Sequence, residues 1–281
     1  MSRPERFAKL NFAPRHVLVT GASGGLGKEL ALHYAAPGVV LTLWGRNASR
    51  LESVAQACRE RGSVVNCHIL SLTAIDDALQ LLRQCDDQHP VDVLILNAGV
   101  SDIRPENALT ETVEAVREAS LVNYAVPAIL ATEAASRMAP RRRGRIAMIG
   151  SVAAHHDLPF ASAYSSSKAG LARFATCLHA AMAPHDVGVT LIEPGYIDTA
   201  MSRRLDGARP FLVTAEDAAA KIARAISRNT AVLVFPRIFL LLKLISAIVP
   251  RGVAHRLLRL AKVKQSAALS DVWRQGAKWG C

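Results

Sequence analysis

The stretch that most constrains the fold lies close to the N-terminus, where a short β-rich run leads through a glycine-rich turn into a helix. The run is His16 to Thr20, the turn is Gly21-Ala22-Ser23-Gly24-Gly25-Leu26-Gly27, and the expected helix is Lys28 to Ala36. Glycines let the main chain approach a pyrophosphate, and a helix N-terminus offers unpaired N–H groups and a positive dipole end. Strand, glycine turn and helix in this order therefore predict a phosphate cradle.

A P-loop is the competing interpretation of the same stretch. It requires Gly-x-x-x-x-Gly-Lys-Ser/Thr, whereas Ala22 stands at the first glycine position and Glu29 at the hydroxyl position. Because magnesium and phosphate would lose contacts there, we reject the P-loop. A merely flexible glycine turn is the other alternative, and the strand and helix that flank the turn so closely argue against it.

Apolar runs and helical stretches then alternate along the chain. The expected strands are Val39 to Trp44, Val64 to Leu70, Val91 to Leu96, Ile146 to Gly150 and Val187 to Glu193, and the expected helices are Ala74 to Cys85, Glu111 to Met138 and Tyr164 to Met182. This alternation predicts βαβ crossovers, and hence an α/β fold with a doubly wound parallel sheet. The basic run Arg141-Arg142-Arg143 before the fifth strand is interpreted as a solvated turn.

Composition agrees with one domain of this kind. A chain of 281 residues can bury a large core, and 51% hydrophobic with only 5% aromatic residues suits helices packed on a sheet. The five cysteines show no Cys-x-x-Cys pair and no histidine at metal spacing, so we expect free thiols, a reducing compartment and no metal. The N-terminus lacks the apolar core of a signal peptide, so a cytoplasmic location is expected.

The net charge of +11 is distributed unevenly along the chain. Residues 1–217 hold 22 Lys/Arg and 22 Asp/Glu, while residues 218–281 hold 12 Lys/Arg and one acid. A nucleic-acid enzyme would show a basic stripe with stacking aromatics on its main domain, and none is found. We therefore expect no nucleic-acid partner, and we locate the excess charge at the C-terminal end.

The second expected strand ends in Gly45-Arg46-Asn47. In dinucleotide-binding enzymes, residues at this position determine the preference for NAD or NADP. Enzymes that prefer NAD place an Asp or Glu there for the ribose 2′-hydroxyl, whereas an Arg accommodates a 2′-phosphate. No acid occurs from Gly45 to Leu51. Arg46 therefore predicts NADP, the alternative being a solvated loop arginine.

Tyr164 and Lys168 lie four residues apart and so share one face of a helix. A free phenol titrates near pH ~10, and a neighbouring ammonium favours the phenolate and lowers that pKa. Tyr164 is therefore a candidate proton donor or acceptor, and Ser151, thirteen residues earlier at a strand tip, is placed to point its hydroxyl into the same pocket. Taken alone, Tyr164 and Lys168 are also compatible with an exposed helical pair.

Further polar positions fall near the same edge of the expected sheet. Asn97-Ala98-Gly99 closes the fourth strand, where ligands gather in doubly wound sheets. Asn123 lies within the long helix just before Pro127, which is expected to kink it. His155 and His156 follow Ser151 and are candidates for lining the pocket, although they make a poor metal site. Residues 196–214 form a loop long enough to act as a lid.

Several of these motifs, taken in order, resemble the short-chain dehydrogenase/reductase family. They are Thr20-Gly21-x-x-x-Gly25-x-Gly27, Asn97-Ala98-Gly99, Asn123, Ser151, Tyr164-x-x-x-Lys168 and Pro194-Gly195-x-x-x-Thr199. The resemblance covers residues 14–236, with Val232 to Phe235 similar to the family's seventh strand. It implies a Rossmann fold with a seven-stranded parallel sheet, helices on both faces and a nicotinamide cofactor, and it leaves residues 237–281 as a C-terminal helical extension.

The resemblance also implies roles for individual residues. Tyr164 is the general acid/base, Lys168 lowers the pKa of Tyr164 and holds the nicotinamide ribose, Ser151 hydrogen-bonds the substrate oxygen, and Asn123 supports a water relay to Lys168. The residues that it implies for cofactor binding are Gly21, Ser23, Gly25, Leu26, Gly27, Arg46, Asn47, Ser71, Leu72, Asn97, Ala98, Gly99, Tyr164, Lys168, Pro194, Gly195, Ile197 and Thr199. Ser71 stands where the family often has an adenine-contacting Asp, so this contact is expected to be weaker or to come from the Ser71-Leu72 main chain.

The C-terminal extension allows two interpretations. Residues 238–249 are almost wholly apolar but shorter than the ~20 residues that span a bilayer, and the segment from Arg251 to Lys264 mixes leucines with basic residues. This pattern is typical of a segment that lies on an anionic membrane surface. The alternative is a helical pair that folds over the substrate cleft or against the partner in a homodimer, and the two interpretations are compatible.

Three classes of function follow. The leading one is an NADPH-dependent oxidoreductase that reduces a ketone to an alcohol, with hydride transfer from the cofactor and Tyr164 as general acid, on a hydrophobic or lipid-like substrate. The second is a cytosolic reductase of small polar carbonyls or sugars. The third is a non-catalytic NADP-binding scaffold, which has no need of the complete Ser151, Tyr164, Lys168 and Asn123 set.

Overall fold

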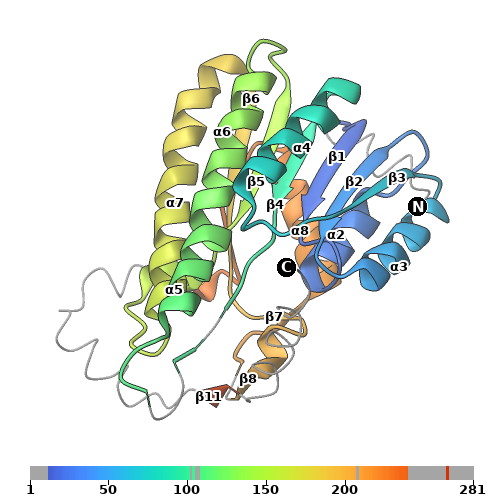
Figure 1. Cartoon of the computed structure of the whole chain (residues 1–281). Coiled ribbons are helices and arrows are strands. Elements are labelled where there is room, and N and C mark those ends of the chain that lie inside the picture. Colours follow the sequence, from blue (N-terminus) through green and yellow to red (C-terminus); the bar gives the residue numbers. More distant parts are fainter. Residues whose placement is uncertain (1–11, 102, 105–107, 207–208, 240–263, 266–281) are drawn as a thin grey trace.

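The computed structural model describes residues 12–101, 103–104, 108–206, 209–239 and 264–265. Its main feature is a sheet of seven strands in the order β10-β6-β5-β4-β1-β2-β3, with every neighbouring pair parallel (Figure 1). The strands are β1 (His16–Thr20), β2 (Val40–Gly45), β3 (Val64–Ile69), β4 (Val93–Leu96), β5 (Gly144–Ile149), β6 (Val187–Pro194) and β10 (Val232–Phe235). The expected doubly wound, seven-stranded parallel sheet is confirmed.

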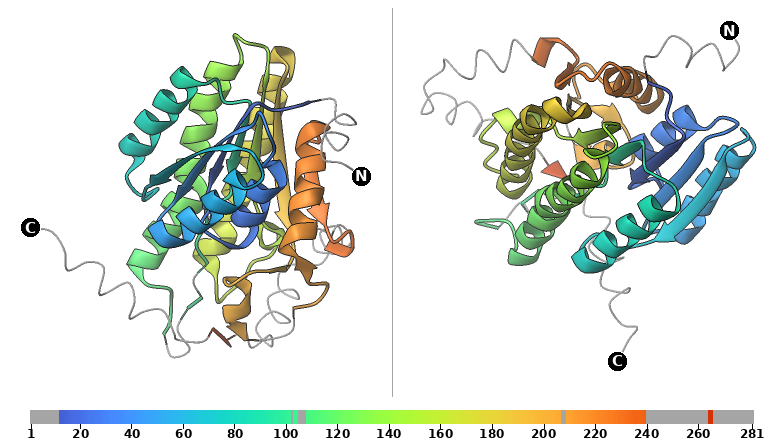
Figure 2. Two further views of the ribbon diagram at one scale, coloured as in Figure 1. Left: turned by 90° about the vertical axis from the view of Figure 1, so that its right-hand side faces the viewer. Right: turned by 90° about the horizontal axis from the view of Figure 1, so that it is seen from above.

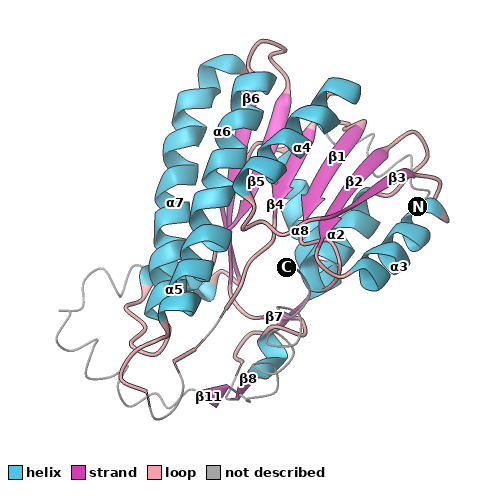
Figure 3. Ribbon diagram, viewed as in Figure 1, coloured by secondary structure: helices cyan, strands magenta, loops and turns pink. Residues whose placement is uncertain are grey.

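Helices cover both faces of this sheet (Figure 2). They are α2 (Gly25–Tyr34), α3 (Ala48–Arg59), α4 (Ile75–Gln88), α5 (Val113–Ser120), α6 (Val126–Met138), α7 (Ser162–Met182) and α8 (Ala215–Ser227). One hydrophobic cluster joins α2, α3 and α8 to one face, and a second cluster joins α4, α6 and α7 to the other. Figure 3 shows the strands as one layer between these helices.

The central strands are apolar runs because the sheet is covered on both faces. All residues of β1, β4 and β6 are buried. The edge strand β3 differs, since Val64 and Ile69 are 63% and 66% exposed. Burial thus explains why continuous hydrophobic runs, rather than alternating ones, marked these strands in the sequence.

All the expected helices differ from the structure in their bounds: α4 is Ile75–Gln88 rather than Ala74 to Cys85, and α7 begins at Ser162 rather than at Tyr164. The first expected helix, α2, begins at Gly25 and not at Lys28, and its residues Leu26 and Gly27 are buried. The long helix from Glu111 to Met138 is divided into α5, a π-helical turn η1 (Leu121–Ala125) and α6. The expected irregularity near Asn123 and Pro127 is therefore a π-turn that places Asn123 at its middle.

The loop that follows β6 contains short elements of its own. They are β7 (Ile197–Asp198), the 3-10 turn η4 (Ser202–Arg204), β8 (Leu205–Asp206) and β9 (Val213–Thr214). Strand β7 pairs with β9, and β8 pairs antiparallel with β11 (Lys264–Gln265) (Figure 1). Apart from residues 237–239 and β11, the expected C-terminal helical extension lies outside the described residues.

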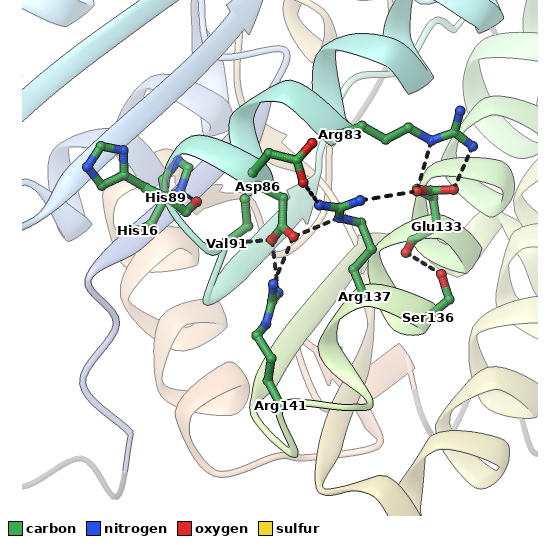
Figure 4. Close-up of polar contacts among 10 residues, drawn as sticks. His16, Arg83, Asp86, His89, Val91, Glu133, Ser136, Arg137 and Arg141 are labelled. Atoms are coloured by element: carbon green, nitrogen blue, oxygen red, sulfur yellow. Dashed lines mark hydrogen bonds and ion pairs between the residues drawn. The ribbon is translucent and has the colours of Figure 1, made fainter.

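The basic turn before β5 is tied into the fold by ion pairs rather than being merely solvated. Arg141 contacts Asp86 at 2.8 Å, Arg143 contacts Asp92 at 2.9 Å, and Arg142 contacts Asp186 at 2.5 Å. Figure 4 shows the Asp86 carboxylate between the guanidinium groups of Arg141 and Arg137. The expectation of a solvated turn missed these partners because all three acids are distant in sequence.

Asp86 is the buried centre of this network. Its side chain is 4% exposed, and it also accepts a hydrogen bond from the Val91 amide at 2.8 Å. Burial acts to raise the pKa of Asp86, but the hydrogen bonds from Arg141, Val91 and Arg137 outweigh burial and hold this pKa below its ordinary value. The network therefore fixes α4 and α6 to each other at the end of the sheet opposite the cavity described next.

Candidate active site

A cavity of about 540 Å³ opens where the carboxyl ends of the parallel strands meet. This edge is the binding position of doubly wound sheets, because the chain leaves neighbouring strands toward opposite faces there. The predicted cofactor residues that line the cavity are Gly21, Ser23, Gly25, Leu26, Arg46, Ser71, Leu72, Asn97, Ala98, Gly99, Tyr164, Lys168, Pro194, Gly195, Ile197 and Thr199. The structure thus brings together segments that are far apart in sequence.

The glycine turn forms a close-fitting cradle between β1 and α2. Gly21 has a φ of +68°, and a Cβ there would lie 2.8 Å from the Cα of Ala98. Gly27 does not line the cavity; a Cβ on it would collide with the carbonyl oxygen of Gly21, so this glycine serves the packing of helix on turn. The N-cap of α2 is Gly24, without a side-chain cap, so the first N–H groups of the helix stay open toward a ligand.

Thr20 and Asn97 join the ends of β1 and β4 beneath this cradle. The Thr20 hydroxyl accepts hydrogen bonds from the main-chain N–H groups of Asn97 and Ala98 at 3.0 and 3.1 Å. The Asn97 side chain donates in return to the carbonyl oxygens of Thr20 and Gly21 at 3.1 and 3.2 Å. Asn97 therefore holds the shape of the cradle as well as lining the cavity.

Tyr164 and Ser151 both line the cavity and are hydrogen-bonded to each other. Tyr164 lies in the first turn of α7, and Ser151 directly follows β5. Burial raises the pKa of Tyr164, the hydrogen bond with the Ser151 hydroxyl counteracts this, and Tyr196 raises it further. Lys168 is not among the causes of this shift. The sequence predicted a lowered pKa for Tyr164, whereas in the structure this pKa is raised.

Lys168 lies one helical turn after Tyr164 and is 4% exposed. Its ammonium donates to the carbonyl oxygen of Ile149 at 2.8 Å and lies 5.9 Å from the centre of the Tyr164 ring. Burial lowers the pKa of Lys168 to about 8. Lys168 is therefore buried and Tyr164 half-buried at the cavity wall, and the alternative of an exposed helical pair is wrong.

Asn123 is fully buried behind the cavity rather than lining it. Its side-chain oxygen accepts from the Val100 N–H at 2.9 Å, and its side-chain nitrogen donates to the Val100 carbonyl at 2.9 Å and to the Ser167 hydroxyl at 3.2 Å. The Ser167 hydroxyl donates to the Tyr164 carbonyl at 2.8 Å. Asn123 thus joins the loop after β4 to the first turn of α7.

One residue that fixes α7 was not singled out in the sequence. The carboxylate of Glu111 accepts from the main-chain N–H groups of Ser162 and Ala163, at 3.0 and 3.1 Å, at the start of the helix that carries Tyr164. This is an N-cap supplied by a distant residue, so no local pattern marks it. Glu111 therefore helps to set the direction in which α7 enters the site.

The end of the cavity near β2 and β3 is lined by Trp44, Arg46, Arg50, Ser71 and Leu72. Arg46 contacts Glu118 at 3.4 Å. Arg50, in the first turn of α3, was not predicted as a site residue. Asn47, a predicted cofactor residue, does not line the cavity. Its side chain instead caps α3 by accepting from the Arg50 N–H at 2.9 Å.

The opposite end of the cavity is mainly apolar. Its lining includes Ile103, Leu158, Phe160, Met201 and Phe239, none of which was predicted as a site residue. Phe239 comes from the start of the C-terminal extension, where its ring contacts Gly195 and lies edge-on to Phe211 with ring centres 6.4 Å apart. In the part of the chain that the structure describes, no group of His, Cys, Asp and Glu side chains is arranged to hold a metal ion.

Known proteins are similar to this chain in sequence or in fold. Residues 15–209 match the family model for short chain dehydrogenase. Dehydrogenase/reductase SDR family member 7B from Rattus norvegicus is 37% identical over 196 residues, which cover 66% of this chain and 59% of that protein. An uncharacterized oxidoreductase from Myxococcus xanthus (strain DK1622) is 32% identical over 223 residues, covering 79% of this chain and 87% of that one.

Among solved structures, a short-chain dehydrogenase from Sphingobium yanoikuyae in complex with NADPH has the same fold. Its TM-score is 0.74 at 24% identity, and the match covers 90% of this chain and 98% of that one. The chain spans about three fifths of the length of the rat relative, 59% as aligned. The family match, residues 15–209, includes the segments that build the glycine cradle and the Tyr164 helix.

Proposed function

Because the chain belongs to the short-chain dehydrogenase/reductase family, we propose that it is an NADPH-dependent carbonyl reductase that acts on hydrophobic ketones. Family membership makes it an NAD(P)-dependent oxidoreductase. The preference for NADPH, the ketone substrate and the residue roles are our proposal. The observation that carries it is one cavity lined by the glycine cradle, by Tyr164 and Ser151, and by a group of apolar side chains.

The protein groups fit the dinucleotide that the family implies. Gly21 and Gly25 adopt positive φ angles of +68° and +53° that bring the main chain close to a ligand. The uncapped N-terminus of α2 offers N–H groups and a positive dipole end to a pyrophosphate. Asn97, Ala98 and Gly99 would lie along the ribose and nicotinamide, and Pro194 and Gly195 would face the nicotinamide from β6.

The proposed reaction assigns proton transfer to Tyr164. The bound nicotinamide supplies the hydride that reaches the carbonyl carbon. Tyr164 donates its phenolic proton to the carbonyl oxygen as negative charge develops, and the Ser151 hydroxyl hydrogen-bonds the same oxygen. Burial keeps Tyr164 protonated at neutral pH, which suits a proton donor.

Lys168 and Asn123 support this step in the proposal. The Lys168 ammonium holds the nicotinamide ribose and stabilises the Tyr164 phenolate after the proton has left, because opposite charges close together favour each other in a buried site. Asn123 keeps Val100 and the first turn of α7 in register, and we assign it the support of a water relay to Lys168. Asn123 is thus a positioning residue.

The preference for NADPH rests on the charges at the end of the cavity near β2. Arg46 and Arg50 both line it, and two guanidinium groups are well suited to a 2′-phosphate. Glu118 pairs with Arg46 at 3.4 Å and would compete with the phosphate for this guanidinium. Both side chains of this ion pair are exposed, so it contributes little free energy. A dianionic phosphate should therefore displace Glu118 from Arg46.

The hydrophobic substrate rests on the apolar end of the cavity. Ile103, Leu158, Phe160, Met201 and Phe239 give a ketone with a long or bulky apolar part a surface to bury, worth about 0.8 kcal/mol for each methylene group. A small polar carbonyl or a sugar would leave this wall in contact with water. This argues for the leading function over a reductase of small polar carbonyls.

Activity of the purified chain with NADPH on ketones of graded chain length tests the proposal. We expect kcat/KM to rise with chain length, and consumption of NADPH to match formation of the alcohol. Faster turnover of sugars or small polar carbonyls would instead support the second function class. Tight NADPH binding without turnover of any carbonyl would support the scaffold.

We further propose a division of the chain into a catalytic domain, residues 14–236, and an extension, residues 237–281, that makes a peripheral contact with an anionic membrane. The support is the charge of the sequence, since residues 218–281 hold 12 Lys/Arg and one acid. No helix in the described ranges is long and apolar enough to cross a membrane. The position of Phe239 supports an extension that also contributes to the cavity wall, and the pairing of β11 with β8 joins the extension to the loop after β6.

A further inference from the structure

Two consecutive histidines follow Ser151 and have different surroundings. The Nε2 atom of His155 lies 2.7 Å from a carboxylate oxygen of Glu193, whose side chain is fully buried at the end of β6. His155 thereby joins the loop after β5 to the end of β6. His156, the next residue, lines the cavity.

The main chain holds His156 firmly in this position. Its N–H donates to the Ala153 carbonyl at 3.2 Å, and its carbonyl accepts from the Ser165 hydroxyl at 2.5 Å and from the Leu158 N–H at 3.0 Å. Ser165 is the neighbour of Tyr164 on α7. The position of His156 is therefore fixed relative to the residue that we propose as proton donor.

The imidazole of His156 has no hydrogen-bonding partner in the part of the chain that the structure describes, although the residue is half-buried. The neighbouring cavity wall, Val152, Leu158, Phe160 and Met201, is apolar. Burial, and secondarily the charge of His155, lower the pKa of His156, while the exposed Asp157 acts in the opposite direction. At neutral pH this ring therefore offers one N–H donor and one nitrogen acceptor to the cavity.

We propose that His156 determines substrate specificity by hydrogen-bonding a second, uncharged oxygen of the substrate, so that the preferred ketone is apolar but carries one further hydroxyl or carbonyl group. This deepens, and rests on, the proposed function. The reacting oxygen is not the partner, because Ser151 and Tyr164 are assigned to it. A carboxylate is disfavoured, since no Lys or Arg among the described residues lines this end of the cavity apart from Lys168.

The effect follows from what an unmatched polar group costs. A substrate without the second oxygen leaves the imidazole nitrogens without a partner once water has been expelled, whereas a matched substrate satisfies one of them. A net hydrogen bond between neutral groups should change kcat/KM by about threefold to tenfold. The change should appear mainly in KM, because the contact is the same in the bound substrate and in the transition state.

The experiment compares pairs of substrates of equal chain length, a plain alkanone and a series of alkanones with one hydroxyl at successive positions. Wild type should prefer the hydroxylated ketone at one or two positions by about threefold to tenfold. His156→Leu should abolish this preference, and His156→Gln, which retains a donor and an acceptor, should keep most of it. Leu158→Met reshapes the apolar wall and should change both substrates of a pair by the same factor.

Calorimetric binding of the corresponding alcohol and diol to the enzyme with NADP gives a readout that does not need turnover. The diol should bind wild type more tightly than the alcohol, and His156→Leu should bind both equally. A wild type without any preference, or a His156→Leu variant that weakens both ligands equally, would overturn the inference. Failure of every ketone to react, together with an intact diol preference, would instead overturn the proposed function and leave the recognition by His156 supported.

Discussion

The ammonium of Lys168 donates to the carbonyl oxygen of Ile149 at 2.8 Å, two residues before Ser151 along the chain. This bond fixes α7 to the end of β5, so the helix that carries Tyr164 and the loop that carries Ser151 are set relative to each other by a buried cation. It also places that cation within 3.6 Å of the position that a Cβ of Gly99 would take, next to the end of β4. Lys168 therefore contacts or lies next to all three segments: α7, the end of β5 and the end of β4.

Tyr164→Phe tests the proposed proton donor. The ring still packs and only the hydroxyl is lost, so we expect kcat to fall ~10²–10⁴-fold while the affinity for NADPH stays nearly unchanged. Fluorescence titration with NADPH and steady-state rates on one reduced ketone measure the two effects. Tyr124→Phe is the matched control, because this tyrosine is 39% exposed on η1 and does not line the cavity. A Tyr164→Phe variant with near wild-type kcat would show that another group supplies the proton.

Lys168→Met should make the fold more stable at neutral pH while removing activity. The pKa of Lys168 is about 8 in the folded protein, below its ordinary value of 10.5, so the unfolded chain binds the proton more tightly. The wild-type free energy of unfolding must then rise with pH between these two values. A shift of this size corresponds to ~3 kcal/mol, against about 1 kcal/mol for the lost bond to Ile149.

Paired denaturant titrations of wild type and Lys168→Met at several pH values check this sign. We expect the variant to be the more stable protein by roughly 2 kcal/mol at pH 7, with the difference shrinking as the pH passes from about 8 to about 10.5. Effects of other titrating groups cancel in the difference. An advantage that grows with pH would mean that the buried lysine is not strained in its charged form.

Arg46→Ala should reduce the preference for NADPH over NADH by roughly tenfold to a hundredfold, because one charge-assisted contact to the 2′-phosphate is lost. Glu118→Gln should act in the opposite direction and strengthen NADPH binding alone, since it removes the competitor that lies 3.4 Å from Arg46. Titration of both cofactors against the three proteins decides the matter. Equal affinities of wild type for NADPH and NADH would contradict the role of Arg46.

The sequence predicted the sheet well because burial makes its central strands continuous hydrophobic runs. The expected range of β10 and of β1 agrees with the structure to the residue, and both strands are short runs with turn residues at their ends. Helices α3 and α8 were not anticipated, although each starts at a capping side chain, Asn47 and Thr214. Asn47 was predicted to contact the cofactor, but an asparagine at this position can also cap the following helix. The structure shows the cap.

Site residues were predicted where they follow strand ends and where Tyr164 and Lys168 lie one helical turn apart. Ser151, Asn97 and the glycine turn lie at strand ends, so the parallel sheet itself brings them together. Phe239 had no such signal, because its contact with Gly195 joins segments through tertiary packing. The pKa of Tyr164 was also beyond pattern reasoning: a lysine one turn away predicts a lower value, but burial, which no spacing reveals, dominates and raises it.

Phe239→Ala should lower the efficiency with long-chain ketones more than with short ones. The ring lines the cavity and packs on Gly195 and Phe211, so its loss removes apolar contact for a long substrate and lets water in. We expect KM to rise about tenfold for the longest ketone and little for the shortest. Phe239→Leu should recover most of the effect, and an equal change for all chain lengths would indicate a general loss of structure instead.

The last prediction concerns the basic extension, whose membrane contact is argued from charge. Each basic residue near an anionic leaflet contributes about 1 kcal/mol, and buried leucines add to this, so attachment should be electrostatic, peripheral and reversible. In co-sedimentation, the full chain should pellet with vesicles rich in phosphatidylserine, not with phosphatidylcholine alone, and should be released by high salt.

Charge reversal separates this contact from the contribution of the extension to the cavity. Replacing Arg256, Arg259 and Lys262 by Glu changes the net charge by the same amount as replacing Arg117, Arg173 and Lys221, which are exposed on the catalytic domain. Only the first triple variant should lose vesicle binding if the extension is the contact, because the second leaves the extension intact while lowering the overall charge equally. If both variants lose vesicle binding equally, the binding is an unspecific attraction by net charge. If both variants keep it, electrostatic attraction is not its cause.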